Sequence, residues 1–174
     1  RPAQAAQVAE TLGAVSNARD GVYAAQAGAA AISVGMVGAS PMEMFDAAVE
    51  AAPVKCWTRR ALERVWEVKS AELEDALQAI ESSLILHWWP WADLVTEAVP
   101  AALAVFLACQ GDFRRAVPAG VRLGRDADTI GAIVGSLAGT YGGEDAIPPA
   151  WRARVQASTG KCIGFVGGRA IVDI

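Results

Sequence analysis

The sequence has few cysteines, no long apolar run and no cluster of basic residues, and each shortage argues against a class of protein. Cys56, Cys109 and Cys162 lie far apart, so they indicate neither a disulfide framework nor a thiolate metal site, and they fit a reducing cytoplasm. The longest apolar stretch, residues 98–109, is shorter than the ~20 residues of a membrane-spanning helix. Because the formal net charge is -4 and basic residues occur only singly or in pairs, we expect neither a nucleic-acid partner nor a membrane partner.

The remaining composition is typical of a folded domain built from helices. Hydrophobic residues make up 53% of the 174 residues and charged residues 20%, a balance that supports one domain with a buried core. Apolar residues recur every three or four positions, and no segment alternates clearly between apolar and polar residues over more than four residues. This periodicity predicts an all-α fold with about seven or eight helices.

Several helix ends are marked by local signals. Ser40 precedes Pro41 and Glu43, which is the pattern of a capping box with proline at the first helical position. Gly111 is expected to stop one helix, and Asp112 to cap the next. The expected helices cover residues 2–12, 20–38, 40–53, 58–69, 70–80, 95–108 and 112–121, followed by one after residue 126 and a short one from residue 148.

Two carboxylates and a hydroxyl stand directly before a glycine-rich helix in the segment GRDADTIGAIVGSLAGTYGG, residues 124–143. Inside a regular helix Asp126 and Asp128 would point about 200° apart, because each residue turns the helix by roughly 100°. Their side chains converge only if Asp126 lies in the preceding turn while Asp128 and Thr129 occupy the first helical positions. Such hard oxygen atoms suit Mg²⁺, Mn²⁺ or Ca²⁺. The alternative is that Asp126 and Thr129 only cap the helix.

Glycines follow the acidic residues at four-residue spacing, at Gly131, Gly135 and Gly139. Each glycine inside a helix costs up to ~1 kcal/mol relative to alanine, so a close approach of another group must compensate. We expect a neighbouring helix to pack against Gly135 and Gly139. For Gly131, one turn from the carboxylates, a ligand close to the backbone is an alternative explanation.

Two other groups of residues have open roles. Trp88, Trp89 and Trp91 lie together in the segment HWWPWADL. We expect them to form a packed corner or a helix interface, and the alternative is a stacking platform for adenine or for a partner. Asp93 and Glu97 either reach the same metal pocket or form an exposed acidic face, and the sequence favours neither role.

The acidic segment, extended to GRDADTIGAIVGSLAGTYGGEDAIP, resembles the C-terminal metal motif of the ADP-ribosylglycohydrolase family, the group that includes the dinitrogenase-reductase-activating glycohydrolase. Three more segments resemble the same family in the same order: VSNARDGVYAAQAGAAA, GASPMEMFDAAVEAAP and VPAALAVFLACQGDFRRAV. The resemblance extends from about Pro2 to Val155, and the acidic motif is its most specific part.

This resemblance implies a compact, all-α orthogonal bundle and a hydrolase that cleaves the glycosidic bond between ADP-ribose and an acceptor. It also implies two Mg²⁺ or Mn²⁺ ions as cofactors, which would act as Lewis acids beside the anomeric carbon. Asp126, Asp128 and Thr129 would be metal ligands, while no residue of this chain is assigned as the catalytic group. The expected partner is an ADP-ribosylated substrate or a related nucleotide.

Two departures from the family pattern shape these expectations. Relatives carry, upstream of the segment that begins here at Arg1, a Thr-Asp-Asp ligand set, a catalytic acidic residue and a loop rich in glycine and asparagine, and none of these occurs in this sequence. Since two carboxylates and one hydroxyl cannot hold two ions, we expect residues 1–174 to be the C-terminal part of one domain, completed by an upstream segment or a complementary chain. Asn17 replaces a substrate-contacting histidine of many relatives, and we expect it to bind substrate through a hydrogen bond.

Two other functions remain open at this point. One is a non-catalytic binding or structural protein, similar to the crystallin members of the family, although the retained Asp126, Asp128 and Thr129 argue against it. The other is a hydrolase of free nucleosides or nucleotides, which the change to Asn17 motivates.

Overall fold

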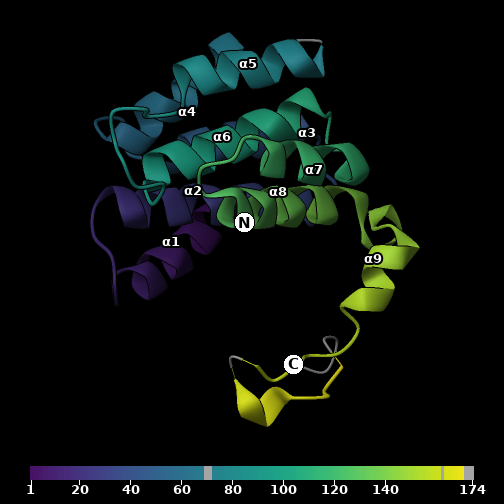
Figure 1. Ribbon diagram of the computed structural model, residues 1–174. Coiled ribbons are helices and arrows are strands. Elements are labelled where there is room, and N and C mark those ends of the chain that lie inside the picture. The colour runs from purple at the N-terminus through teal and green to yellow at the C-terminus, as the bar shows by residue number, and fades with distance from the viewer. Residues whose placement is uncertain (69–71, 162, 171–174) are drawn as a thin grey trace.

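The computed structural model describes residues 1–68, 72–161 and 163–170, and helices dominate it (Figure 1). The α-helices are α1 (Pro2–Gly13), α2 (Asp20–Gly35), α3 (Pro41–Ala51), α4 (Trp57–Val68), α5 (Leu73–Ser83), α6 (Val95–Ala108), α7 (Phe113–Arg122), α8 (Ala127–Gly142) and α9 (Pro149–Arg154). Two 3₁₀ turns, η1 (Glu144–Ala146) and η2 (Gly164–Val166), accompany them. The all-α prediction is confirmed, and the nine α-helices of the described ranges correspond to the nine segments expected to be helical, slightly more than the overall count of about seven or eight.

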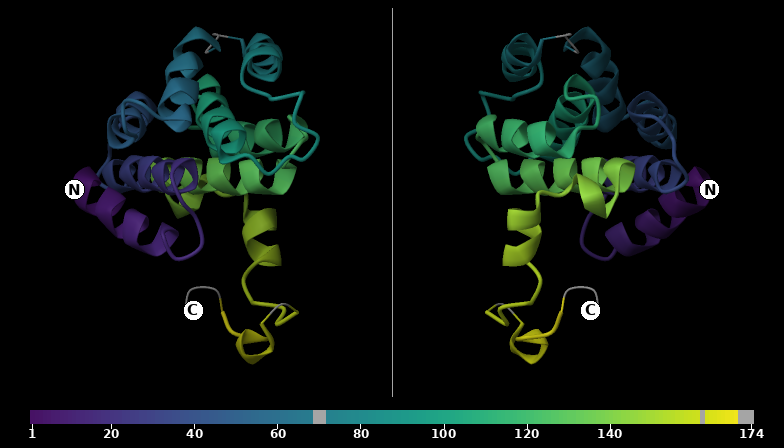
Figure 2. Two further views of the ribbon diagram at one scale, coloured as in Figure 1. Left: turned by 90° about the vertical axis from the view of Figure 1, so that its left-hand side faces the viewer. Right: turned by 90° about the vertical axis from the view of Figure 1, so that its right-hand side faces the viewer.

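Helix α6 lies at the centre of the bundle. Nearly all of its residues are buried, and it packs against α2, α3, α4, α5, α7 and α8. Figures 1 and 2 show α4 and α5 on one side of α6, with α2 and α8 on the other side and α1 outside α2. This arrangement explains the long apolar stretch of the sequence, because a helix surrounded on all sides has no polar face.

The helices with side-chain caps begin where the sequence predicted. The Ser40 hydroxyl accepts a hydrogen bond from the Glu43 amide at 3.3 Å, and the Glu43 carboxylate accepts one from the Ser40 amide at 2.7 Å. The hydrogen bonds from Ser40 hold the pKa of Glu43 below its usual value. At the start of α7, the Asp112 carboxylate accepts hydrogen bonds from the amides of Arg114 and Arg115.

Two helix ends differ from those expected. Helix α2 ends at Gly35 rather than near Gly38, and α5 begins at Leu73 rather than at residue 70. Residues 69 and 70, which were expected to end one helix and begin the next, lie outside the described residues. In the part of the chain that is described, no helix has the length and apolarity needed to cross a bilayer.

The glycine edge of α8 faces α7, and its tightest point is Gly131. A Cβ atom at Gly131 would lie 2.9 Å from Val121 Cγ2 of α7, closer than real Cβ contacts allow. At Gly135 and Gly139 the nearest atoms, also on α7, would be 3.7 Å away, an ordinary van der Waals distance. A neighbouring helix therefore accounts for all three positions. The ligand considered for Gly131 is not needed, and of the three positions Gly131 has the closest contact.

We expect Gly135→Ala to stabilise the protein and Gly131→Ala to stabilise it less or not at all. The Gly131 substitution requires the half-exposed Val121 side chain to turn away from the added methyl group, which offsets the gain in helix propensity, whereas the Gly135 substitution gains up to ~1 kcal/mol of helix propensity in a site that accepts a methyl group. Chemical denaturation of each variant gives the free energies of unfolding. Equal effects of the two substitutions would contradict the packing described for Gly131.

Candidate metal site

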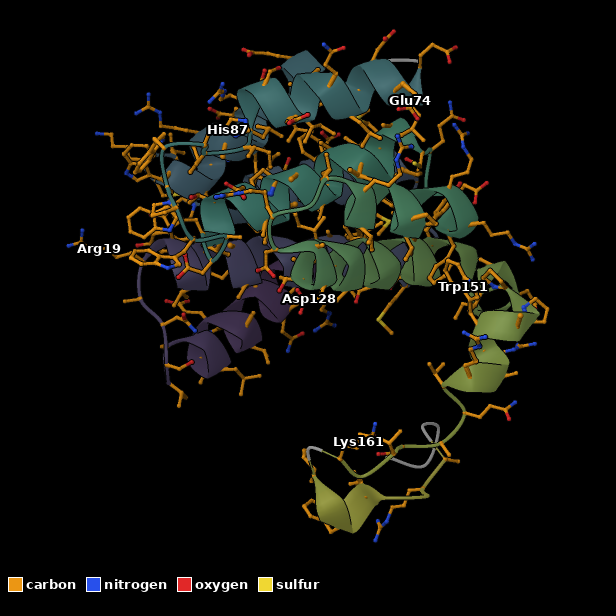
Figure 3. The ribbon with its side chains drawn as sticks, in the orientation of Figure 1. Arg19, Glu74, His87, Asp128, Trp151 and Lys161 are labelled. Carbon is orange, nitrogen blue, oxygen red and sulfur yellow. The ribbon has the colours of Figure 1, made fainter. Side chains whose placement is uncertain are left out.

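The acidic motif lies at the turn between α7 and α8, with the backbone arrangement that convergence of its side chains requires. Gly124 and Arg125 both have left-handed conformations, with φ of 69° and 56°. Asp126 follows as the N-cap residue of α8, and Asp128 and Thr129 are the second and third residues of the helix. Figure 3 shows Asp128 at this end of α8.

None of the three side chains has a structural role in the described residues. Asp126 occupies the N-cap position but makes no capping hydrogen bond, unlike Ser40 and Asp112, so the alternative that it only caps the helix is wrong. Among the described residues, the side-chain oxygen atoms of Asp126, Asp128 and Thr129 make no hydrogen bond and no ion pair. Asp126 is half-buried and the other two are exposed. Their oxygens are therefore available to a ligand.

The available oxygens match Mg²⁺ or Mn²⁺ in kind but not in number. Both ions prefer hard oxygen ligands, and an octahedral site needs six of them with water included. Within residues 1–68, 72–161 and 163–170, no group of three or more His, Cys, Asp or Glu side chains is placed to hold a metal. The motif thus fits part of a divalent-cation site, and further ligands are required to complete one.

Arg125, which immediately precedes Asp126, forms an ion pair with the buried carboxylate of Glu97. Arg125 Nε donates to Glu97 Oε1 at 2.8 Å, and Arg125 Nη2 donates to Glu97 Oε2 at 3.1 Å. Glu97, on the central helix α6, is 1% exposed, and its Oε2 also accepts a hydrogen bond from the Leu86 amide at 2.8 Å. The hydrogen bond with Glu97 raises the pKa of Arg125. The guanidinium next to the acidic motif is therefore engaged by another carboxylate.

This pair corrects both roles considered for Glu97. It neither forms an exposed acidic face nor offers free oxygens to a metal pocket, because its carboxylate is buried and accepts three hydrogen bonds. Asp93 is exposed and accepts a hydrogen bond from Trp89 Nε1 at 2.9 Å. The signal that could have identified the pair is one carboxylate inside an otherwise apolar helix, since such a group requires a buried partner.

The segment that contains Trp88, Trp89 and Trp91 is hydrogen-bonded to the same arginine through its backbone. Arg125 Nη2 donates to the backbone oxygens of Trp89 and Trp91, both at 3.2 Å. Trp88 and Trp91 keep 71% and 65% of their surface exposed, and each ring meets Trp89 edge-on. The expectation of a packed corner is wrong for Trp88 and Trp91, whose rings lie mostly at the surface.

Asn17 lies in the connection between α1 and α2 and is exposed. Its Nδ2 atom donates to Ser16 Oγ at 3.0 Å, and its backbone amide donates to the Gly13 oxygen. In the described chain no hydrogen bond joins Asn17 to the acidic motif. Its expected contact with substrate stays a prediction.

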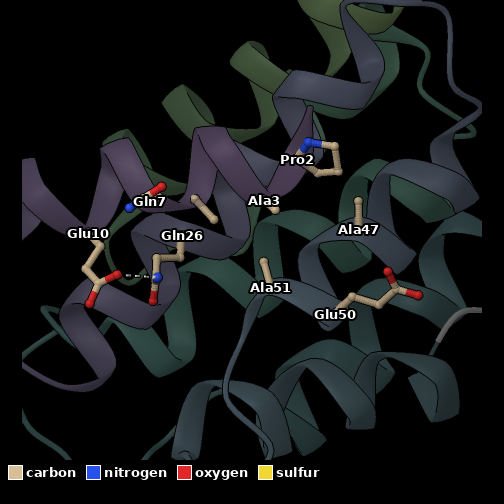
Figure 4. A pocket seen from close by; sticks show the side chains of 9 residues that line it. Pro2, Ala3, Gln7, Glu10, Gln26, Ala47, Glu50 and Ala51 are labelled. Carbon is tan, nitrogen blue, oxygen red and sulfur yellow. Dashed lines mark hydrogen bonds between the residues drawn. The ribbon is translucent and has the colours of Figure 1, made fainter.

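Two of the larger pockets lie away from the acidic motif. A pocket of about 530 Å³ is bordered by α1, α2 and α3, with Glu10, Gln26 and Glu50 among its lining residues (Figure 4). Within it, Gln26 Nε2 donates to Glu10 at 3.3 Å. A shallower apolar pocket of about 620 Å³ lies between α1 and α2. Neither pocket includes Asp126 or Asp128, so neither is a ready substrate site around the motif.

Comparison with known proteins decides the family. A family model described as ADP-ribosylglycohydrolase matches residues 1–169. The chain belongs to the ADP-ribosylglycohydrolase family. No solved structure was found to match it. The family match indicates a hydrolase of the ADP-ribosylglycohydrolase type. The all-α bundle around α6 agrees with that family.

Proposed function

We propose that this member of the ADP-ribosylglycohydrolase family is a metal-dependent hydrolase that cleaves the glycosidic bond between ADP-ribose and an acceptor. The single observation that carries the proposal is the acidic motif at the start of α8, where the Asp126 side chain occupies the N-cap position but makes no capping hydrogen bond. Two carboxylates and a hydroxyl without partners in the described residues are the hard ligands that Mg²⁺ and Mn²⁺ prefer.

The charge around the motif supports the binding of a cation. Asp126 and Asp128 lie within three residues of each other, and the adjacent Arg125 directs its guanidinium to Glu97 instead. In the described chain, neither carboxylate therefore has a neutralising side chain as a partner. Where two such carboxylates converge, they repel each other, and a divalent cation between them would remove this repulsion.

In the proposed site, Asp126, Asp128 and Thr129 hold one side of a pair of Mg²⁺ or Mn²⁺ ions. When bound, the ions would supply Lewis-acid stabilisation beside the anomeric carbon. The remaining ligands come from an upstream segment of the same protein or from a complementary chain. We propose that Asn17 donates or accepts a hydrogen bond with the substrate, a role that its exposed amide permits.

The test is a titration of the full protein with Mn²⁺, followed by assays on three substrate classes in parallel: ADP-ribosyl-arginine, ADP-ribosyl-serine and free nucleosides. We expect saturable Mn²⁺ binding, release of ADP-ribose from an adduct, and loss of this activity with EDTA. Hydrolysis restricted to nucleosides would favour the alternative substrate that Asn17 suggested. Binding of ADP-ribose without hydrolysis would favour a non-catalytic relative, and the absence of metal binding would overturn the proposal.

A further inference from the structure

We propose that Arg125 is a positioning residue for the acidic motif, and that its contacts with Glu97 and the tryptophan segment hold Asp126 and Asp128 in the geometry that binds metal. This inference rests on the proposed metal site. Arg125 itself contacts neither metal nor substrate in the proposal, and it acts through the backbone conformation that it stabilises.

The first step is the conformation of the turn. The chain passes from α7 to α8 through two consecutive left-handed residues, Gly124 and Arg125. Glycine adopts this conformation freely, but a residue with a Cβ atom is disfavoured there. Arg125 therefore needs a compensating interaction, and the residue that follows it is Asp126, whose direction depends on this turn.

The second step is the compensating interaction. The Arg125 guanidinium makes two hydrogen bonds to the buried Glu97 carboxylate and two to backbone oxygens of residues 89 and 91. These contacts join the beginning of α8 to the central helix α6 and to the segment that precedes α6. Arginine suits this role because its planar guanidinium presents several donors in fixed directions. Outer partners of this kind commonly orient metal ligands.

The chain offers a matched control three residues earlier. Arg122 Nη1 and Nη2 donate to the two oxygens of Glu74, each at 2.8 Å. This pair has similar hydrogen bonds, but its side chains are 57% and 70% exposed, and Arg122 ends α7 without touching the acidic motif. A general effect of losing an Arg–Glu pair would appear in both places, whereas an effect on positioning would appear only at Arg125.

The test compares the double variant Glu97→Gln/Arg125→Gly with the control Glu74→Gln/Arg122→Ala in the full protein. Glutamine keeps an acceptor for the Leu86 amide and leaves no buried charge unpaired, while glycine tolerates the left-handed turn. Mn²⁺ titration is expected to show a roughly 10–100-fold loss of affinity in the first variant and wild-type affinity in the control. Hydrogen exchange without metal is expected to accelerate at residues 130–133, the first amides of α8 with helical acceptors, in the first variant alone.

The outcomes separate this inference from the proposed function. If wild-type protein binds no Mn²⁺, the proposed function fails, while hydrogen exchange still tests whether the Arg125 contacts order the start of α8. If wild-type protein binds Mn²⁺ and the Glu97/Arg125 variant binds it equally well, or its exchange is unchanged, the inference is overturned. Should that variant not fold, Arg125→Lys takes its place, with a smaller loss of affinity expected because one ammonium cannot reproduce the four hydrogen bonds.

Discussion

Replacing Asp126 and Asp128 together by asparagine is expected to abolish Mn²⁺ binding and to lower kcat roughly 10³-fold, while the protein stays folded. Metal ions contribute several kcal/mol to the stabilisation of developing charge, and each 1.36 kcal/mol corresponds to about tenfold in rate. Asparagine keeps the size of each side chain but removes the negative charge that attracts the cation. Because neither carboxylate has a partner in the described residues, no structural contact is lost there.

Thermal denaturation, Mn²⁺ titration and steady-state kinetics on the same preparations would check this expectation. Asp112→Asn is the matched control, since Asp112 begins the preceding helix and its capping hydrogen bonds can also be accepted by asparagine. We expect this control to bind Mn²⁺ and to hydrolyse substrate as the wild type does. Full activity of the Asp126/Asp128 double variant would exclude the motif from the catalytic site, whatever substrate the protein uses.

The sequence identified the backbone that would let the acidic side chains converge, but not the residues that hold it. A turn at Gly124 and a helix start after Asp126 were the condition for this convergence, and glycine is common in turns while acidic residues are common in the first turn of a helix. Arg125 received no role, since its partner Glu97 lies 28 residues earlier and nothing in the local pattern joins them. Glu97 itself was read as either a metal ligand or a surface residue. Long-range pairs of this kind depend on how helices pack.

Side-chain caps explain two of the helix starts that could be predicted. Ser40 and Asp112 bond to amides two or three residues away, so their effect is local and visible in the sequence. Helix α5 begins at Leu73 with no side-chain cap, after Glu72 in an extended conformation, and its start was misplaced. The exposure of Trp88 and Trp91 was missed for a related reason, because composition alone does not tell whether aromatic residues lie against a core or outside it.

Removal of the Glu97 carboxylate is expected to have the largest effect on stability among the polar residues considered. Glu97→Ala leaves the Arg125 guanidinium without its ion partner and the Leu86 amide without an acceptor. Breaking a buried pair from one side costs about 3–5 kcal/mol. Since the Arg125 side chain keeps 20% of its surface exposed, water can solvate part of the guanidinium, and we expect about 3 kcal/mol. Chemical denaturation would measure this loss as a lower midpoint with an unchanged slope.

A double-mutant cycle would show whether the loss comes from the pair or from the cavity that alanine leaves. If the ion pair dominates, Glu97→Ala costs much less in an Arg125→Ala background, because no guanidinium remains to be left unpaired. Additive effects within ~0.5 kcal/mol would instead indicate independent sites and would contradict the pair's contribution. Glu74→Ala provides the exposed counterpart, and there we expect no measurable change, since solvent-exposed ion pairs contribute little. The contrast follows from burial, because the two pairs have similar hydrogen-bond lengths and differ mainly in their access to water.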